Sequence, residues 1–155
     1  MMRTVDEATC NAPPEAVWPF AAHVERWPDI LRHYRWVTRH RGAPGGDGLV
    51  EMAAWRQFGP LAWPTWWESE MWVDAERHEI RYRHVRGITK GMDVLWTITP
   101  GANGGSTVRI VHEWAGPDWP LIGLAAARFV IGPVFVHAIA TRTLHGVTRA
   151  AEHAT

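Results

Sequence analysis

Four side chains in this sequence have the chemistry of acid–base groups: Tyr34, Arg83, His112 and His137. A phenol can donate or relay a proton, an imidazole can act as a general base near neutral pH, and a guanidinium can stabilise a developing anion. Each also has a plain structural interpretation. A strand tyrosine can simply reach water, most histidines are hydrogen-bonded without catalysing anything, and the arginines of Arg81–Arg86 alternate onto what is usually a solvent face. Which interpretation holds for each residue depends on where the helices and strands position its side chain.

Metal binding and nucleophilic catalysis have less support. The nine histidines form no HxxxH, HxH or Cys/His cluster, and His78 and His84 are too far apart along one strand to share an ion. Cys10 is the only cysteine, so it forms no intramolecular disulfide, and no serine lies in a Gly-x-Ser-x-Gly turn. We therefore expect neither a metal nor another cofactor.

Composition limits the partners and the location. Lys+Arg and Asp+Glu are balanced at 16 each, so the basic excess typical of nucleic-acid-binding domains is missing and no nucleic-acid partner is expected. A chain of 155 residues fits one domain over residues 1–155. Charges in the first ten residues argue against a signal peptide, and the lone cysteine fits a reducing compartment, which together predict a cytoplasmic protein.

Residues Trp119–Ala140 imitate a membrane span in length and apolarity. However, Arg128 lies near the centre, where an arginine costs about 2.5–3.5 kcal/mol on an insertion scale, and Gly132-Pro133 interrupts the segment. We predict an apolar approach segment leading into a helix, with no transmembrane segment.

The hydrophobic periods predict a strand, two short helices, six strands and one long helix. Proline-rich starts after Asn11 and at Pro28 mark the short helices, with Asn11 or a neighbour as cap, and Ala138–His153 has the composition of the long helix. Short turns predict antiparallel pairing. The strands are expected at Val5–Cys10, 34–39, Leu49–Phe58, Thr65–Asp74, Glu79–Val85, Met92–Thr99 and Thr107–Trp114.

Such an order predicts an α+β helix-grip fold, in which a curved seven-stranded antiparallel sheet wraps around the long C-terminal helix. A cavity remains between sheet and helix wherever side chains do not meet. The tryptophans show what would line it.

The stretch PTWWESEMW places three indoles in nine residues of one predicted strand. By two-residue alternation, Trp67, Ser69 and Met71 share one face. The other face carries two glutamates, which marks it as solvent, so that Trp66 and Trp72 are exposed or lie under a loop. The members of this outer face are Trp66, Glu68, Glu70 and Trp72.

The same alternation puts Trp96 on an apolar inner face, and it groups Ile110, His112 and Trp114 on one face of the last strand. These rings either form an ordinary core or wall a cavity for a flat, conjugated ligand.

The element order, together with NAPPEAVW, ERWPDI, the WTI strand and the terminal helix, resembles the START-like (SRPBCC) helix-grip superfamily. Within it the chain is most similar to the polyketide cyclase/aromatase families of the tetracenomycin type, over nearly its whole length. The resemblance implies pocket positions for Trp27, Tyr34, Trp67 and Trp96. It aligns His137 with a polar pocket position on the last helix.

The resemblance also implies a second pocket arginine at Arg83 or, allowing a one-residue gap, at His84. One position departs from the pattern, because Met71 stands where those enzymes carry the arginine proposed as the central acid/base group.

By this resemblance we expect an aromatase/cyclase that folds a poly-β-ketone intermediate, carried on an acyl carrier protein, and catalyses its aldol cyclisation and dehydration. Tyr34 would donate or relay the proton, with His137 or His112 as base and Arg83 as electrostatic help. Met71 keeps open a second interpretation, a carrier of a quinone, a lipid or another hydrophobic small molecule without catalysis. A third makes the outer tryptophans, with Trp119–Phe135, a docking surface for a partner or a membrane.

Overall fold

A computed structural model describes residues 1–117 and 135–155 of the protein. The helical elements are α1 (Pro14–Ala22), η1 (Val24–Arg26), α2 (Trp27–Ile30), η2 (Ala102–Gly104) and α4 (His137–Ala154). The strands are β1 (Met2–Cys10), β2 (Tyr34–Gly42), β3 (Gly48–Phe58), β4 (Leu61–Asp74), β5 (Glu79–Gly87), β6 (Asp93–Pro100) and β7 (Ser106–Trp114).

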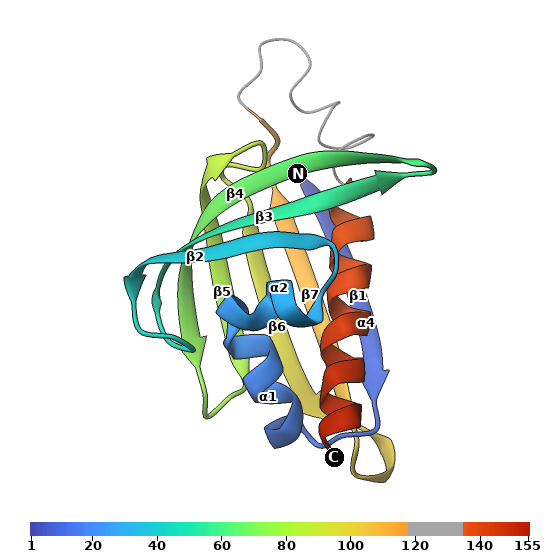
Figure 1. The fold of residues 1–155 in the computed structure, drawn as a ribbon. Helices are drawn as coiled ribbons and strands as arrows, with labels where there is room; N and C mark the ends of the chain where they lie inside the picture. Colours follow the sequence, from blue (N-terminus) through green and yellow to red (C-terminus); the bar gives the residue numbers. More distant parts are fainter. Residues whose placement is uncertain (118–134) are drawn as a thin grey trace.

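All seven strands form one sheet in the order β1-β7-β6-β5-β4-β3-β2, and every neighbouring pair is antiparallel. The two strands that flank the short helices, β1 and β2, therefore lie at opposite edges. Figure 1 shows β2, β3 and β4 curling across the molecule toward α4, so that the sheet surrounds the helix on more than one side.

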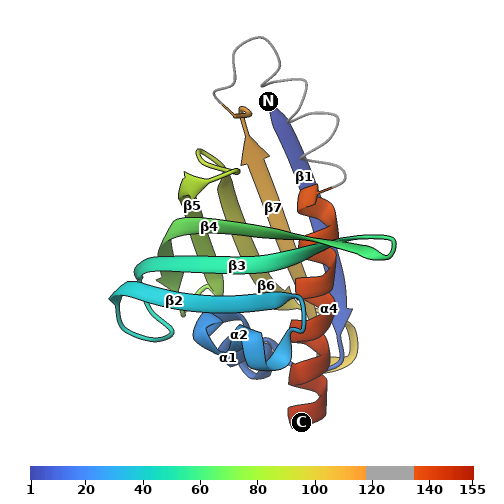
Figure 2. The ribbon, with the colours of Figure 1, turned by 45° about the horizontal axis from the view of Figure 1, so that its top comes forward.

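The predicted helix-grip fold is confirmed. Helix α4 packs against β1 and β7 and, on another side, contacts α1 and α2; Figure 2 shows it beside α2 from a second direction. Its buried positions recur every three or four residues, which gives the helix one apolar stripe toward the sheet. These positions are Ala140, Thr143, Leu144, Val147, Thr148 and Ala151.

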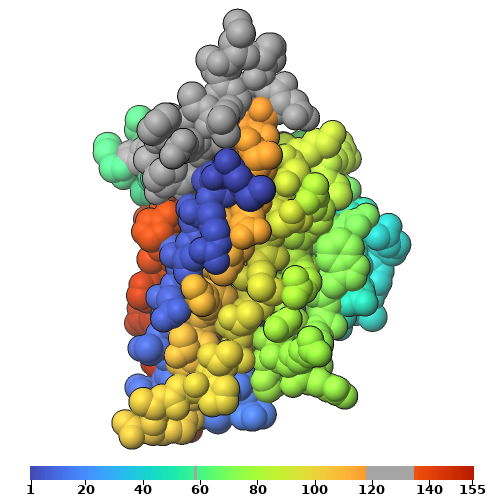
Figure 3. Space-filling view, turned by 180° about the vertical axis from the view of Figure 1, so that it is seen from behind, coloured from blue at the N-terminus to red at the C-terminus, as the bar shows by residue number. Residues whose placement is uncertain are grey.

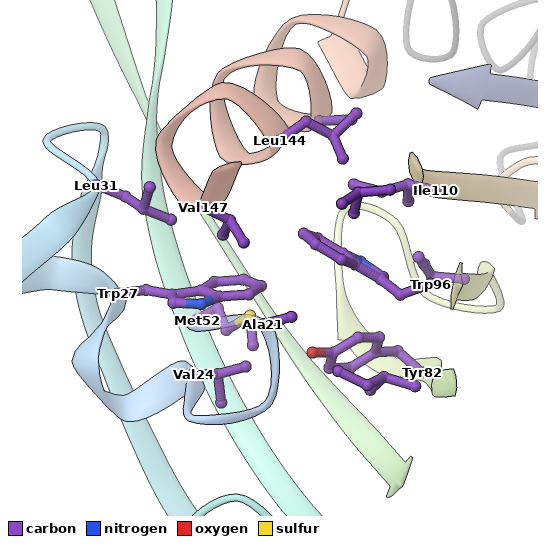
Figure 4. Close-up of a cluster of buried hydrophobic side chains, with 14 of the residues drawn as sticks. Ala21, Val24, Trp27, Leu31, Met52, Tyr82, Trp96, Ile110, Leu144 and Val147 are labelled. Atoms are coloured by element: carbon purple, nitrogen blue, oxygen red, sulfur yellow. The ribbon is translucent and has the colours of Figure 1, made fainter. Parts of the chain in front are cut away.

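The core follows the predicted strand alternation. In β7 every second residue from Ser106 to Trp114 is buried, and in β6 the buried residues are Val94, Trp96 and Ile98. Trp27 from α2 and Trp96 from β6 point toward one another beside Leu144 and Val147 of α4 (Figure 4). The short helices thus close one end of the space between sheet and helix.

Two local expectations at the short helices differ from the structure. Pro13, with no side-chain hydrogen bond, occupies the N-cap of α1, while the backbone N–H of Asn11 donates to Glu152 at 2.9 Å. Helix α2 begins at Trp27, which is helical although a proline follows. The Trp27 indole N–H donates to the Phe20 carbonyl at 2.8 Å, and this contact and the ring's burial outweigh the local pre-proline preference.

The outer face of β4 matches the prediction for its tryptophans but not for Glu68. Trp66 and Trp72 are exposed, whereas Glu68 is buried. The Arg86 guanidinium lies over the Trp66 ring and pairs with the Glu68 carboxylate at 3.5 Å, so it covers this glutamate on the sheet surface. Figure 3 shows the outer face from behind, from the blue of β1 through β7 and β6 to the green of β5 and β4.

Most of the apolar segment Trp119–Ala140 lies outside the described residues, including Arg128 and Gly132-Pro133. Within the two described ranges, no helix is both long and apolar enough to cross a membrane.

Candidate functional site

A cavity lies between the inner face of the sheet and the first turns of α4; the empty space in and around it, open solvent included, is about 580 Å³. Every strand from β2 to β7 contributes at least one side chain to it. Its lining consists of Trp27, Tyr34, Met52, Trp67, Tyr82, His84, Thr89, Met92, Val94, Trp96, Ile110, His112, Phe135, Val136, Ile139, Ala140 and Thr143.

Aromatic rings form a connected wall along this cavity. Trp27 contacts Trp96 and Tyr34 at ring-centroid distances of 5.6 and 5.1 Å. Tyr34 contacts Trp67 at 6.1 Å, and Trp67 stacks on His84 at 5.9 Å with an interplanar angle of 15°. Rings that hold one another have few alternative rotamers, so the wall is preorganised for a flat ligand.

Tyr34 is held in its protonated form at the cavity wall. Burial raises the pKa of the Tyr34 hydroxyl above its usual value, and a hydrogen bond with Thr143 opposes part of that rise. The Thr143 hydroxyl oxygen also lies 2.8 Å from the Ile139 carbonyl, to which it can donate, and 3.0 Å from His33 Nε2. Which group donates in the contact with His33 depends on the tautomer of that imidazole.

His33 lies behind this wall, with its ring 4.8 Å from that of Tyr34. Burial, followed by the charge of Arg142, lowers the pKa of His33 to about 4. A chain of buried polar groups thus runs from the Tyr34 hydroxyl through Thr143 to a neutral imidazole on the far side of the wall.

Two further histidines face the cavity in neutral form. Burial lowers the pKa of His112 to about 4; burial and then the proximity of His112 lower the pKa of His84 to about 3. His84 Nδ1 is 2.6 Å from the Thr89 hydroxyl, whereas His112 Nδ1 has no hydrogen-bond partner among the described residues. This Nδ1 is buried, and in the tautomer protonated at Nε2 it carries a lone pair that no described residue uses.

The described lining contains no Asp, Glu, Lys or Arg. Its polar groups are phenols, hydroxyls and neutral imidazoles, since burial also raises the pKa of Tyr82. The cavity therefore suits an uncharged, unsaturated molecule with several oxygen atoms, because a buried charge would find no partner in it.

Comparison with known proteins identifies the family of this chain. A family model described as polyketide cyclase/dehydrase and lipid transport matches residues 10–138. The chain belongs to the polyketide cyclase/dehydrase and lipid transport family. No curated protein is similar enough to count as a match.

Solved structures agree with this family at the level of the fold. TTHA0849 from Thermus thermophilus superposes with a TM-score of 0.80 at 18% identity, covering 99% of each chain. The Zhui aromatase/cyclase from a Streptomyces species gives 0.80 at 20% identity, covering 98% of this chain and 94% of that one. The steffimycin-pathway di-domain aromatase/cyclase StfQ gives 0.72 at 19% identity, covering 97% of this chain and 45% of that one.

Five of the residues singled out from the sequence meet in the cavity of this polyketide cyclase family member. They are Trp27, Tyr34, Trp67, Trp96 and His112.

Arg83 and His137 do not line the cavity. Arg83 is half exposed on the outer face of β5 and pairs with Asp93, its cross-strand neighbour. His137, at the start of α4, pairs with Asp6 of β1, whose pKa burial raises and the imidazole lowers. The helix turns Val136, Ile139, Ala140 and Thr143 toward the cavity, and residue 137 is off that stripe.

Ser69, Met71 and Trp114 are buried on the inner face but do not reach the cavity. The Trp114 indole donates to the Lys90 carbonyl at 2.9 Å. At Met71, where the resemblance implies an arginine, the sulfur lies 3.9 Å from Nη2 of Arg39, whose guanidinium pairs with Glu25. A buried arginine is therefore present near this position, but it comes from β2 and carries its own counter-charge.

Tyr82 and Thr143 are cavity residues that sequence analysis missed, and His84 entered only as an alternative to Arg83. Two-residue alternation in Arg81–Arg86 puts Tyr82 and His84 on the face opposite the arginines, so the sequence pattern could have identified both as inward-facing. Thr143 lies on the same helical stripe as Ala140 and Val147.

One group of possible metal ligands was not visible as a sequence motif. His40, Glu51 and Glu68, from three adjacent strands, place one ligand atom each within 4.8 Å of one another on the outer face. Glu51 accepts from the Trp36 indole at 2.8 Å, and Glu68 pairs with Arg86 at 3.5 Å. Both carboxylates thus have protein partners.

Proposed function

We propose that this chain, as a single domain over residues 1–155, is an aromatase/cyclase acting on a poly-β-ketone chain delivered by an acyl carrier protein. The observation that carries the proposal is the cavity itself, whose described lining has no charged side chain but has an aromatic wall, a protonated phenol and an unpaired imidazole nitrogen. Membership in the family and the likeness to aromatase/cyclases support it.

The proposed reaction is an intramolecular aldol condensation. A base removes a proton from a methylene between two carbonyls, and the resulting carbanion attacks a carbonyl carbon farther along the same chain. The new alkoxide takes up a proton, and the hydroxyl then leaves as water with formation of a carbon–carbon double bond. The residues supply proton transfer and above all position, because such a chain can close in several registers.

Tyr34 and His112 have the proposed acid–base roles. Tyr34 stays protonated in the cavity and can donate to the alkoxide, while the free Nδ1 of His112 can accept the methylene proton. A low pKa makes His112 a weak base, so it suits only a substrate whose methylene is already acidic. Trp27, Trp67 and Trp96 would fix the fold of the chain between them.

A second candidate function uses the same cavity without chemistry. The weak basicity of His112 and the methionine at position 71 favour a carrier that holds a quinone, a lipid or a similar molecule unchanged. This carrier would need the aromatic wall but not the Tyr34 proton.

The test is the product profile of a minimal aromatic polyketide synthase, by liquid chromatography and mass spectrometry, with and without this protein. We expect shunt products to give way to one cyclised product. Tyr34→Phe should lower its yield by about 10²-fold or more, the lower range for loss of a general acid. Trp66→Phe, an aromatic change on the outer face, is the matched control. An unchanged profile across several chain lengths, with a hydrophobic ligand retained in native mass spectrometry, would establish the carrier instead.

A further inference from the structure

A second concave surface, the α2–α4 groove, lies where α4 passes the end of α2 and the three residues that connect α2 to β2. Its floor is apolar, formed by Ile30, Leu31, Gly146 and Ala150. Its edges carry only cationic or titratable side chains: Arg32, His33, Arg142, His145, Arg149 and His153.

The arginines of this groove have no counter-ions. In the parts of the chain that the structure describes, Arg32, Arg142 and Arg149 form no ion pair or hydrogen bond, although Asp and Glu equal Lys and Arg in number. Six arginines of the sheet and its turns behave differently, because each of them pairs with a carboxylate, whereas Arg35 stacks on tryptophan rings instead. The six are Arg3, Arg77, Arg81, Arg83, Arg86 and Arg109. The charge of Arg142 lowers the pKa of both His33 and Arg56, which shows like charges gathered together.

Two arginines and two histidines of α4 form a line along the helix rather than a point. Residues 142, 145, 149 and 153 follow the three- and four-residue spacing of one helix face and span about 16 Å at 1.5 Å per residue. One phosphate contacts about one turn of such a line. An anion with charges repeated at the same spacing contacts all of it, and the secondary structure with that spacing is another helix.

Gly146 brings the apolar floor close to this line of side chains on α4. A Cβ at this position would lie 2.0 Å from Cδ2 of Leu31, so only glycine allows the α2 end to approach α4 this closely without displacing Leu31. The result is an apolar trough with positive charges along its edges.

From these observations we propose that the α2–α4 groove binds an acidic amphipathic helix of a partner protein. The apolar stripe of the partner helix contacts the partly exposed Ile30 and Ala150, and its carboxylates face Arg32, Arg142 and Arg149. The inference does not depend on catalysis in the cavity.

The test uses the full chain and a fluorescein-labelled helical peptide with leucines along one stripe and glutamates flanking it, followed by fluorescence anisotropy. A peptide of the same composition in scrambled order is the ligand control. We expect the ordered peptide to bind more tightly than the scrambled one and to weaken as NaCl is raised. Arg142→Gln with Arg149→Gln should weaken binding about tenfold, the size expected of two exposed charge contacts. Arg142→Lys with Arg149→Lys should retain most of it.

The protein control is Arg81→Gln with Arg109→Gln, which removes the same charge from the sheet and should change binding less than about twofold. Equal binding of ordered and scrambled peptides, or equal loss in both double variants, would overturn the proposal, since either would reflect general attraction to a cationic protein. Binding of inorganic phosphate or of anionic phospholipid vesicles, lost in the Arg142/Arg149 double variant while the ordered peptide does not bind, would assign the groove to a different anion.

Discussion

The cavity and the α2–α4 groove are separated by one layer of side chains and have opposite chemistry. On the cavity side stand aromatic rings and neutral polar groups, and the described lining holds no formal charge. The groove has three arginines that pair with no other described residue, beside an apolar floor. Thr143 faces the cavity, His33 faces the groove, and the hydrogen bond between them crosses the layer.

This difference shows how one helix can serve two kinds of ligand. Residues of α4 at 139, 140 and 143 face the cavity, and those at 142, 145 and 149 face the groove, so neighbouring sequence positions point into different environments. Burial removes charge on one side, and solvent permits it on the other. Each region should therefore respond differently to substitution.

The largest effect is expected from the cavity wall. Trp96→Ala removes a ring packed against Trp27 at 5.6 Å and leaves a void between α2 and β6, which should lower the free energy of unfolding by about 3–5 kcal/mol. Arg149→Gln in the groove should change it by no more than about 0.5 kcal/mol, because this side chain is exposed. Urea denaturation followed by far-ultraviolet circular dichroism measures both. Comparable losses in the two variants would contradict the division between a packed wall and an open groove.

A smaller effect on the free energy of unfolding, seen only at acidic pH, is expected from His112. Its pKa is near 6.5 in the unfolded chain and about 4 in the folded one, so between these values the unfolded chain binds more protons. The free energy of unfolding should therefore fall as the pH is lowered from about 6.5 to about 4, by on the order of 3 kcal/mol from this group.

His112→Gln should reduce that acid-dependent loss, and urea titrations at several pH values measure it. His153→Gln, an exposed histidine of α4, is the matched control and should keep the wild-type slope. If both variants lose stability with the same slope as the wild type, His112 is not held neutral by burial.

Sequence analysis identified the fold because its signals are local and repeated. Two-residue alternation placed Trp67 and Trp96 inward and grouped His112 with Ile110, and the composition of Ala138–His153 located α4 to within a residue at each end. Proline and glycine marked the turns that set the strand order. These patterns arise because one face of each strand or helix is buried, and burial of one face also determines how the elements pack in the structure.

The site was less predictable because it depends on contacts between distant elements. The family resemblance implied a pocket position for His137. In the structure this side chain lies off the helix face that lines the cavity and pairs with Asp6. Glu68 looked solvent-exposed until Arg86, on the next strand, was seen to cover it. The Thr143 contact with His33 joins residues that are 110 positions apart, and no local pattern records such a pair.

The smallest and most specific effect tests the layer between the two regions. The Arg142 charge is one cause of the low pKa of His33, so Arg142→Gln should raise that pKa. Burial, the larger cause, remains in the variant. The rise should therefore be a few tenths of a pH unit, the size expected of a charge at an exposed surface.

Proton NMR titration of the histidine ring resonances measures this shift, with His33 assigned by its loss in His33→Gln. Arg149→Gln, a groove arginine that is not among the causes of the His33 shift, is the matched control and should leave the pKa of His33 nearly unchanged. Added salt should reproduce part of the Arg142→Gln effect by screening the charge. Equal shifts in the two variants would mean that His33 senses the total charge of the groove. A shift in Arg142→Gln alone would mean that the charge of this one arginine acts on His33, the groove-side neighbour of the Thr143 hydroxyl.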